Sequence, residues 1–508
     1  MTMKLLRRLS MLICLQICLF FVIRQNLRIV KESDTIYDAA TVSMKQNLHQ
    51  DTSYVDKKTY YSKLKELNES IPNEILDQVN FHKIIKSLTN STSNCGRLPM
   101  LKDIQFNNLY WQELELANSS KEFLYRAYYD NRTLNTDKPS IRIISVLHTN
   151  IISRIKYCQI WFPDRLIRSQ VTSIIFDRMP ETMIKKTCII TCNIPKVYKS
   201  LIPKGVSVLE NECDNPATNL LKVNHHLPEN GIKEGVAVCA KAFDFSDQDK
   251  SIYFIQWLEL FDILGFSKVF LYDYNSHPTL KRVLEYYQSL DRIELIPLTV
   301  PGPHPNQYGL MLPYLLQNGG VKQLHDKVAW NDCYYRNINK YKYISIQDTD
   351  EIIIPTDGKS IQETFDFVKS NLLNTSQNSL FNAPSGYEFN GATFTEELLQ
   401  LNGNNPNIPT YMSLLQSVYR RGITKFIKTV LSSEHIVTIS THSPHHCFGT
   451  CTLVTVPIEQ AYIHHYRKGE REAMHTDHVI NDTSIWSHKE ELLIRVQKAL
   501  DANNIIPV

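Results

Sequence analysis

Hydrophobic and polar residues follow two different patterns along the chain, one before and one after about residue 234. Between about residues 138 and 230, short runs rich in β-branched residues are separated by turn residues, which is typical of strands in a small β module. These runs are Ile141–Val146, Val171–Phe176, Thr187–Thr191 and Val206–Leu209. From Glu234 onward, short apolar runs alternate with longer segments of helical spacing. This second pattern predicts an α/β domain with a mostly parallel sheet flanked by helices.

The second region can be divided into single elements. The pattern predicts strands at Val236–Ala240, Lys268–Tyr272, Arg292–Val300 and Tyr343–Gln347, and helices at Ser251–Leu264, Pro278–Ser289 and Lys322–Asn339. Gly265 is a signal for a helix end, and Pro278 suits a first helical turn. Ligands of such sheets bind at the carboxyl ends of the strands. We therefore expect a ligand near residues 273–276, 301–305 and 348–351.

The acidic stretch at 348–351, Asp-Thr-Asp-Glu, lies between two apolar runs. Three acids in such a place are costly unless a positive charge compensates them. In an extended segment Asp348 and Asp350 would point the same way, roughly 6–7 Å apart. Such a pair can hold a divalent cation that bridges the phosphates of a nucleotide diphosphate. The alternative is a solvated acidic turn, which is how we interpret a second D-x-D at Asp247–Asp249.

The amino terminus carries an apolar run, Leu9–Ile23, with basic residues at positions 4, 7, 8, 24 and 28. This pattern favours an uncleaved signal anchor, because no small-x-small site follows it; a cleaved signal peptide is the alternative. The preceding positive charge places residues 1–8 in the cytosol and the rest of the chain in the lumen. Residues 24–94 are polar, with little periodicity, and are interpreted as a stem.

Composition agrees with a lumenal protein. The chain has 508 residues, enough for two or three cores, and a net charge of +3, which does not favour nucleic acid. Sequons for N-glycosylation occur at Asn68, Asn90, Asn118, Asn131, Asn374 and Asn481.

Eleven cysteines are present, and all but Cys14 and Cys18 follow the apolar run. In an oxidising lumen some of these nine should form disulfides, and their odd number leaves at least one unpaired. The C-x3-C pairs Cys188/Cys192 and Cys447/Cys451, the latter after His445 and His446, are alternatively metal ligands, although zinc usually requires tighter, doubled spacing. Sequence does not fix the disulfide partners.

An ordered set of motifs from about residue 236 to residue 467 resembles glycosyltransferase family 92, a group of galactosyltransferases with the GT-A fold. The motifs are W-L-E-x3-x-L-G at 257–265, V-F-L-Y-D-Y-N-S at 269–276, L-x2-Y at 284–287, N-D-C-x2-R at 331–336, D-x-D-E-I-I-x-P at 348–355, T-K-F-I at 424–427, His442 and A-x-I-x-H-Y-R at 461–467. Gln256, Phe261 and His277 depart from the common family pattern. The resemblance implies inverting transfer of a hexose, galactose from UDP-galactose, to a glycan acceptor on a glycoprotein or polysaccharide.

The resemblance also implies a metal site. Asp348, Asp350 and His465 would bind Mn²⁺, which suits mixed carboxylate and imidazole ligands better than Mg²⁺ does. His464 would be packed away or solvated, because adjacent residues of an extended segment face opposite sides.

Several other residues of the motifs have a predicted role in substrate binding or catalysis, and for some of them a second interpretation stays open. Asp273 faces the nucleotide or is a turn residue, and His442 contacts the substrates or is a loop histidine. Lys425 and Arg467 would contact the diphosphate of the UDP-sugar. Glu388 is the candidate base for the acceptor hydroxyl, with Glu434 and Glu459 as competitors. In the N-D-C-x2-R motif, Arg336 pairs with a carboxylate or a phosphate, and Cys333 is interpreted as buried structure.

The expected organisation is a cytosolic tail at 1–8, a transmembrane signal anchor at 9–23, a stem at 24–94, a β-rich accessory module at 95–233 and a GT-A-like glycosyltransferase domain at 234–508. Such a single-pass type II protein would lie in the Golgi membrane with its catalytic domain in the lumen. Two other functions stay open: a catalytically inactive glycan-binding module, and a metal-dependent phosphoesterase, which usually needs a second cluster of histidines and acids.

Overall fold

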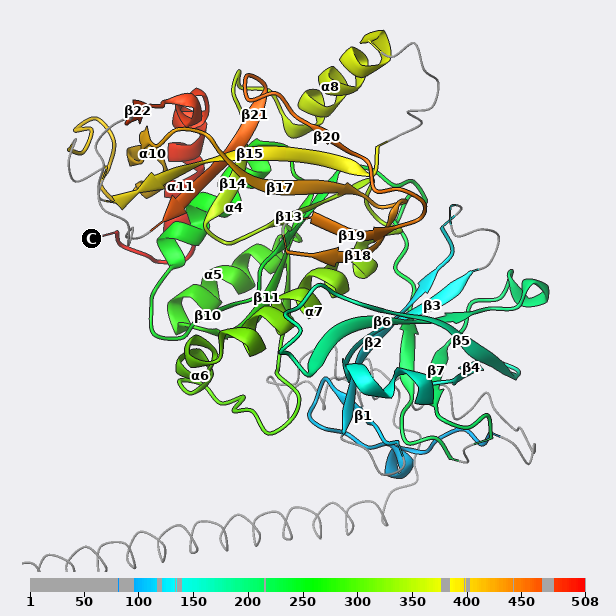
Figure 1. Cartoon of the computed structure of the whole chain (residues 1–508). Helices are drawn as coiled ribbons and strands as arrows, with labels where there is room; N and C mark the ends of the chain where they lie inside the picture. The colour runs from blue at the N-terminus through cyan, green and yellow to red at the C-terminus, as the bar shows by residue number, and fades with distance from the viewer. Residues whose placement is uncertain are drawn as a thin grey trace, which may run out of the picture. The chain divides into compact units, whose positions relative to one another are not determined.

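The computed structural model describes residues 81, 96–116, 121–132, 134, 139–213, 216–375, 384–396, 398, 403–441, 443–467 and 479–507 (Figure 1). The predicted tail and signal anchor, and the predicted stem apart from residue 81, lie outside these residues. Among the residues that are described, no helix has both the length and the apolar character needed to cross a membrane.

The β-rich region forms an eight-stranded sheet that closes on itself. The strand order is β1-β2-β3-β6-β5-β4-β7-β8, and β8 pairs back with β2. The β2–β8 pair is parallel and the other pairs are antiparallel. The elements are η1 (Leu101–Asp103), β1 (Gln112–Leu114), β2 (Glu122–Asp130), β3 (Ser140–His148), η2 (Thr149–Arg154), β4 (Tyr157–Trp161), β5 (Leu166–Phe176), β6 (Lys185–Asn193), η3 (Lys196–Tyr198), β7 (Gly205–Leu209) and β8 (Leu221–Asn224). All four strands predicted in this region are confirmed.

The second region has a twelve-stranded mixed sheet. Its main path is β10-β11-β9-β13-β17-β15-β16-β22, while β12 joins β11, β14 joins β21, and β20 and β21 join β15. The strands are β9 (Val236–Ala240), β10 (Phe243–Phe245), β11 (Lys268–Ser276), β12 (Ile293–Pro297), β13 (Tyr343–Gln347), β14 (Glu351–Pro355), β15 (Gly386–Thr395), β16 (Tyr419–Arg420), β17 (Thr424–Ser432), β20 (Leu453–Thr455), β21 (Ala461–Arg467) and β22 (Ile480–Asn481), and β18 (Ile436–Ser440) pairs separately with β19 (Ser443–Cys447). Strands β9 to β13 run parallel, as predicted for the four of them that the sequence indicated, whereas β10 was not predicted. β17 is antiparallel to β13, so the mostly parallel sheet holds for only part of the region.

Helices flank this sheet and follow the predicted order. They are α4 (Ser251–Ile263), α5 (Pro278–Ser289), α6 (Met311–Gln317), α7 (Gly319–Asn337), α8 (Ile361–Thr375), α10 (Ser413–Gln416), η4 (Ser484–His488) and α11 (Lys489–Ala502). Gly265 follows α4 with a φ of +82°, which glycine adopts without steric cost. α4, α5 and α7 match their predicted positions to within a few residues, because periodicity and end signals specify them locally.

The side chains of β9 show how the sheet separates two cores. Val236 and Val238 pack in the core that contains α4, α5 and α11, whereas Ala237 and Cys239 pack in the core that contains α7. This alternation follows from the two-residue period of a strand. The second core also includes side chains of β2, β3 and β6, and α7 lies between the sheet and these strands (Figure 1).

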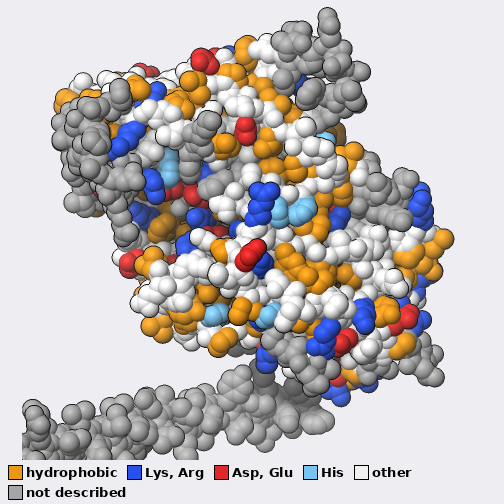
Figure 2. Space-filling model, in the orientation of Figure 1, with side chains coloured by type: hydrophobic (Ala, Val, Ile, Leu, Met, Phe, Trp, Pro, Cys, Tyr) orange, Lys and Arg blue, Asp and Glu red, His pale blue; other side chains and the backbone are white. Residues whose placement is uncertain are grey.

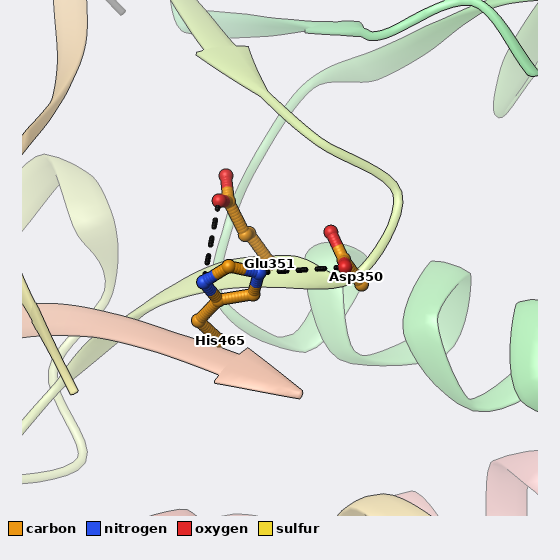
Figure 3. Close-up of side chains that lie close together, drawn as sticks. All are labelled: Asp350, Glu351 and His465. Atoms are coloured by element: carbon orange, nitrogen blue, oxygen red, sulfur yellow. Dashed lines mark ion pairs between the residues drawn. The ribbon is translucent and has the colours of Figure 1, made fainter. Parts of the chain in front are cut away.

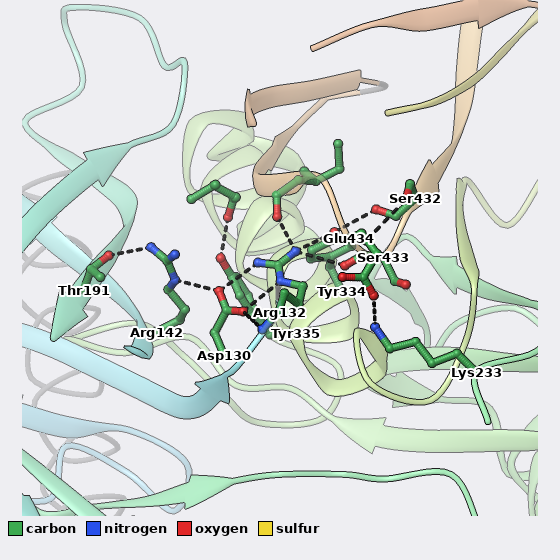
Figure 4. A network of polar contacts seen from close by, with 12 residues as sticks. Asp130, Arg132, Arg142, Thr191, Lys233, Tyr334, Tyr335, Ser432, Ser433 and Glu434 are labelled. Atoms are coloured by element: carbon green, nitrogen blue, oxygen red, sulfur yellow. Dashed lines mark hydrogen bonds and ion pairs between the residues drawn. The ribbon is translucent and has the colours of Figure 1, made fainter. Parts of the chain in front are cut away.

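Buried ion pairs join the β-rich region to the second region (Figure 4). Asp130, at the end of β2, accepts hydrogen bonds from Arg132 (2.8 Å) and Arg142 (2.9 Å). Arg132 also donates to the carbonyl groups of Ser433 (3.0 Å) and Ile436 (2.6 Å), which lie after β17. Burial alone would raise the pKa of Asp130, but the two guanidinium groups hold it below its ordinary value.

The N-D-C-x2-R motif on α7 belongs to this interface. Asp332 is fully buried and accepts hydrogen bonds from Arg126 (2.8 Å), Tyr128 (2.7 Å) and Tyr272 (2.7 Å). Arg336 pairs with Glu294 at 2.8 Å, so the carboxylate alternative applies to this arginine. The motif therefore holds the two regions together.

The cysteines form structural disulfides. Cys158 is bonded to Cys192, Cys239 to Cys333, and Cys447 to Cys451. Cys213 is also disulfide-bonded, and Cys188 is a buried free thiol. Both metal-ligand alternatives for the C-x3-C pairs are therefore wrong, and Cys333 is structural, as predicted. An unpaired cysteine is confirmed among the described residues.

Candidate metal centre

The acidic stretch forms a turn between β13 and β14. The Glu351 amide donates a hydrogen bond to the Asp348 carbonyl (3.2 Å), and the Asp348 amide donates to Glu351 Oε2 (3.1 Å). The extended conformation expected for Asp348 and Asp350 is therefore wrong, because the turn interrupts the two-residue period of the strands. As a result the two aspartates contact different basic partners.

Asp350, Glu351 and His465 meet where β14 lies beside β21 (Figure 3). His465 Nε2 is 3.4 Å from Asp350 Oδ2, and His465 Nδ1 is 3.8 Å from Glu351 Oε1. One ligand atom from each of the three residues lies within 4.8 Å of the others. Two carboxylates and an imidazole at this spacing form a donor set that suits a divalent transition metal.

A buried lysine neutralises the other side of the turn. Lys428, in β17, is 1% exposed, and its Nζ lies 2.9 Å from Glu351 Oε2 and 3.2 Å from Asp348 Oδ2. Lys241, directly after β9, lies 3.8 Å from Asp348 Oδ2. Neither lysine was predicted as a site residue. Position at a strand end could have indicated Lys241, but Lys428 reaches the acids only because β17 pairs with β13.

Burial of the Glu351 carboxyl group changes its pKa. Desolvation and the charge of Asp348 raise the pKa of Glu351 to about 7, while Lys428 opposes this rise. Glu351 Oε1 is buried and accepts no hydrogen bond from the described residues. Since a buried polar atom normally has a partner, the residues present fit a cation held between Asp350, His465 and this carboxylate.

The two adjacent histidines have different environments. His464 is fully buried and stacks on Phe394 with ring centroids 4.5 Å apart. Its ring nitrogens lie 3.2 Å from the hydroxyl groups of Tyr466 and Ser484, and burial lowers its pKa to about 4. The prediction that His465 faces the acids while His464 is packed away is confirmed in this geometry.

Two further polar groups lie at the carboxyl edge of the parallel strands. Asp273 Oδ1 and the Tyr253 hydroxyl are buried, and neither has a hydrogen-bond partner among the described residues. Burial and the nearby charge of Asp244 raise the pKa of Asp273 to about 7. Burial and the charge of Asp350 raise the pKa of Tyr253. Asp273 was a predicted site residue, whereas Tyr253 was not, because nothing in the sequence separates it from other helical tyrosines.

Glu388 lies away from the metal-ligand candidates. Thr393 is the register partner of His465, and Glu388 comes five residues earlier in β15, about 17 Å away along the strand. Its carboxylate accepts a hydrogen bond from Thr455. Of its competitors, Glu434 pairs with Lys233, and Glu459 is exposed.

The remaining predicted residues lie near the limits of the described chain. Arg467 is exposed at the end of β21, beside Thr395 of β15. Lys425 belongs to β17, but its side chain lies outside the described part, and so does the whole of His442.

The face shown in Figure 2 has a hollow in which acidic, basic and histidine side chains gather. Within the described ranges, Asp350, Glu351 and His465 are the one group of three or more possible metal-binding side chains. The second cluster that a two-metal phosphoesterase needs is therefore not found in those ranges.

These features define a mixed α/β protein with a candidate metal centre beside its largest sheet. Residues 234–496, about half of the chain, match glycosyltransferase family 92, and the chain belongs to this family. It is thus a glycosyltransferase by family. No curated protein matches the chain.

Proposed function

We propose that the chain transfers a hexose, galactose from UDP-galactose, to a glycan acceptor with inversion and with the help of Mn²⁺. The single observation that carries the metal proposal is the meeting of Asp350, Glu351 and His465 at the start of β14, directly after the turn that follows β13. Ligands of open α/β sheets bind at this edge. The family match supports a sugar donor and a glycan acceptor.

In this proposal, Asp350, Glu351 and one ring nitrogen of His465 would hold the cation. Asp348, which was also predicted as a ligand, lies instead beside Lys241 and Lys428. Lys428 in turn holds Glu351 and Asp348 in place. When bound, the cation supplies positive charge that stabilises the leaving diphosphate. Glu388 is left out as the base because of its distance along β15.

The nucleotide would occupy the carboxyl edge of β11 and β13. Asp273, with its buried unpartnered oxygen, is suited to a hydrogen bond with the nucleoside. Arg467 comes two residues after His465 and is exposed, so it is suited to contact diphosphate oxygens. Lys425 and His442 keep the diphosphate and substrate roles that the resemblance implies.

The test uses the full-length chain purified in detergent and supplied with a panel of UDP-sugars, glycan acceptors and either Mn²⁺ or EDTA. Asp350→Asn and His465→Ala should abolish transfer and the thermal stabilisation by Mn²⁺. The matched control is Asp247→Asn in the other D-x-D, where the aspartate is exposed. NMR of the product anomer tests inversion.

Transfer that survives EDTA would contradict the metal proposal. A wild-type chain that neither transfers galactose nor releases UDP from the donor would instead favour the inactive glycan-binding alternative.

We further propose a Golgi location with type II topology. The support is the apolar run Leu9–Ile23 with its flanking basic residues, together with the disulfides, which persist in oxidising compartments. Asn131 and Asn481 are exposed sequon residues. Treatment with an N-glycosidase should increase electrophoretic mobility, and an unchanged band would contradict the topology.

A further inference from the structure

A separate cavity lies between the β-rich region and the loop after β12. Its volume is about 470 Å³, within the ~300–1,000 Å³ typical of small-ligand sites. Four lining residues come from before the family-matched segment and four from the loop after β12: Asn107, Lys121, Phe123, Lys185, Pro301, Gly302, Pro303 and His304. Since β12 is parallel to β11, this loop leaves the same sheet edge as the candidate metal centre.

The walls combine apolar surface with a closely approaching backbone. Gly302 has a φ of +92°, and a Cβ added there would lie 3.6 Å from Phe123 Cζ and 3.7 Å from His304 Nε2. The Gly302 amide donates to Asn107 Oδ1 (2.8 Å), which ties the loop to the β-rich region. His304 Nδ1 is 2.5 Å from the Tyr314 hydroxyl. The other ring nitrogen of His304, Nε2, is therefore the one that lies beside Gly302.

Of the two lysines that line the cavity, Lys185 forms no ion pair with any described residue. Lys121 Nζ lies 2.8 Å from Glu113 Oε2. Lys185 Nζ lies 4.3 Å from the ring centroid of Phe123 and donates to the Lys121 carbonyl. Glu122 and Glu113 are near enough to favour its charge, but burial is the larger effect and lowers the pKa of Lys185. Among described residues no carboxylate lies within ion-pair distance of it, so an anion would complete its environment.

We propose that this cavity binds an anionic sugar unit of the acceptor, one that carries a carboxylate, sulfate or phosphate group. Lys185 and Lys121 would contact the anion, and Phe123 with the two prolines would contact the sugar ring. The acceptor is favoured over the donor because both lysines and Phe123 lie outside the family-matched segment. The proposal rests on the proposed glycosyltransferase function, and it gives the β-rich region a part in acceptor choice.

The test measures binding without the donor and in EDTA, so it does not depend on transfer. Methyl glucuronide and methyl glucoside differ only in the oxidation state of C6 and form a matched probe pair for ligand-observed NMR. Glucose 6-sulfate and glucose 6-phosphate test the other anions, and inorganic sulfate tests the anion alone. We expect the anionic sugars to bind about tenfold or more tightly than methyl glucoside, because the lysine ammonium groups attract the anion.

Lys185→Met removes the charge but keeps most of the side chain, and it should weaken methyl glucuronide binding about tenfold. Lys121→Met is a second variant that is safer for folding, because Lys121 is 72% exposed. The control is Lys196→Met, at an exposed lysine elsewhere in the β-rich region.

Equal binding of glucuronide and glucoside, or unchanged binding by both variants, would overturn the proposal. It would also be overturned if inorganic sulfate bound as tightly as glucose 6-sulfate, because the sugar ring would then contribute nothing. Release of UDP from the donor alone is measured separately, with Lys196→Met as the control variant. Absence of that release in wild type would count against the proposed function, whereas the binding result would stand independently.

Discussion

Replacing Lys428 with methionine tests how the acidic turn is stabilised. The lysine side chain is 1% exposed and contacts Asp348 and Glu351 at 3.2 and 2.9 Å. Removing one partner of a buried ion pair typically costs about 3–5 kcal/mol, because the remaining charge is left without compensation. Here two carboxylates would lose their nearest cation, and Lys241, at 3.8 Å from Asp348, would compensate only in part.

The expected change in melting temperature follows from the size of the folded unit. Residues 72–508 form one unit of about 440 residues, for which the unfolding entropy is about 0.9 kcal/mol/K. A loss of about 3–5 kcal/mol therefore lowers the melting temperature by about 3–5 °C in EDTA. Saturating Mn²⁺ should recover more than half of this loss, since a cation beside Asp350 and Glu351 replaces the missing charge.

Differential scanning fluorimetry of the full-length chain, in EDTA and in a Mn²⁺ series, measures both effects. The control is Lys359→Met, which breaks an exposed ion pair with Asp357 and should cost at most about 1 kcal/mol. If Lys428→Met melts like the control in EDTA, Lys428 does not stabilise the acidic turn. If Mn²⁺ stabilises neither wild type nor Lys428→Met, no cation binds beside Asp350 and Glu351.

Three further predictions concern groups outside the lysine contacts. Asp332→Leu should lower the free energy of unfolding by about 3–5 kcal/mol in urea titrations, because Arg126 and Arg336 lose a buried carboxylate; unchanged stability would contradict the structural role of the motif. The folded protein retains a proton on Asp273 up to about pH 7, whereas the unfolded chain releases it near pH 4. Wild-type stability should therefore fall from pH 4 to 7, and Asp273→Asn should remove this part of the slope in melting curves. His464→Ala should cost about 2–4 kcal/mol as a core truncation yet keep the Mn²⁺ response; loss of that response would contradict its packing role.

Local sequence signals were sufficient to predict most of the secondary structure. β9, α5 and β13 have the bounds that the sequence predicts, because strand and helix periodicity and the proline of α5 act over a few residues. The opposite facing of His464 and His465 was also predictable, since it depends only on strand alternation. The family motifs identified the same region that matches glycosyltransferase family 92.

The partners of these residues depended on contacts between distant parts of the chain. Lys428 reaches Asp348 and Glu351 because β17 aligns with β13, and Cys192 pairs with Cys158 rather than Cys188. The turn at residues 348–350 replaced the expected extended segment. A sequence pattern specifies the period of an element and the face on which a side chain lies. The strand register decides which side chains meet, because it is set by burial and hydrogen bonding summed over the whole sheet.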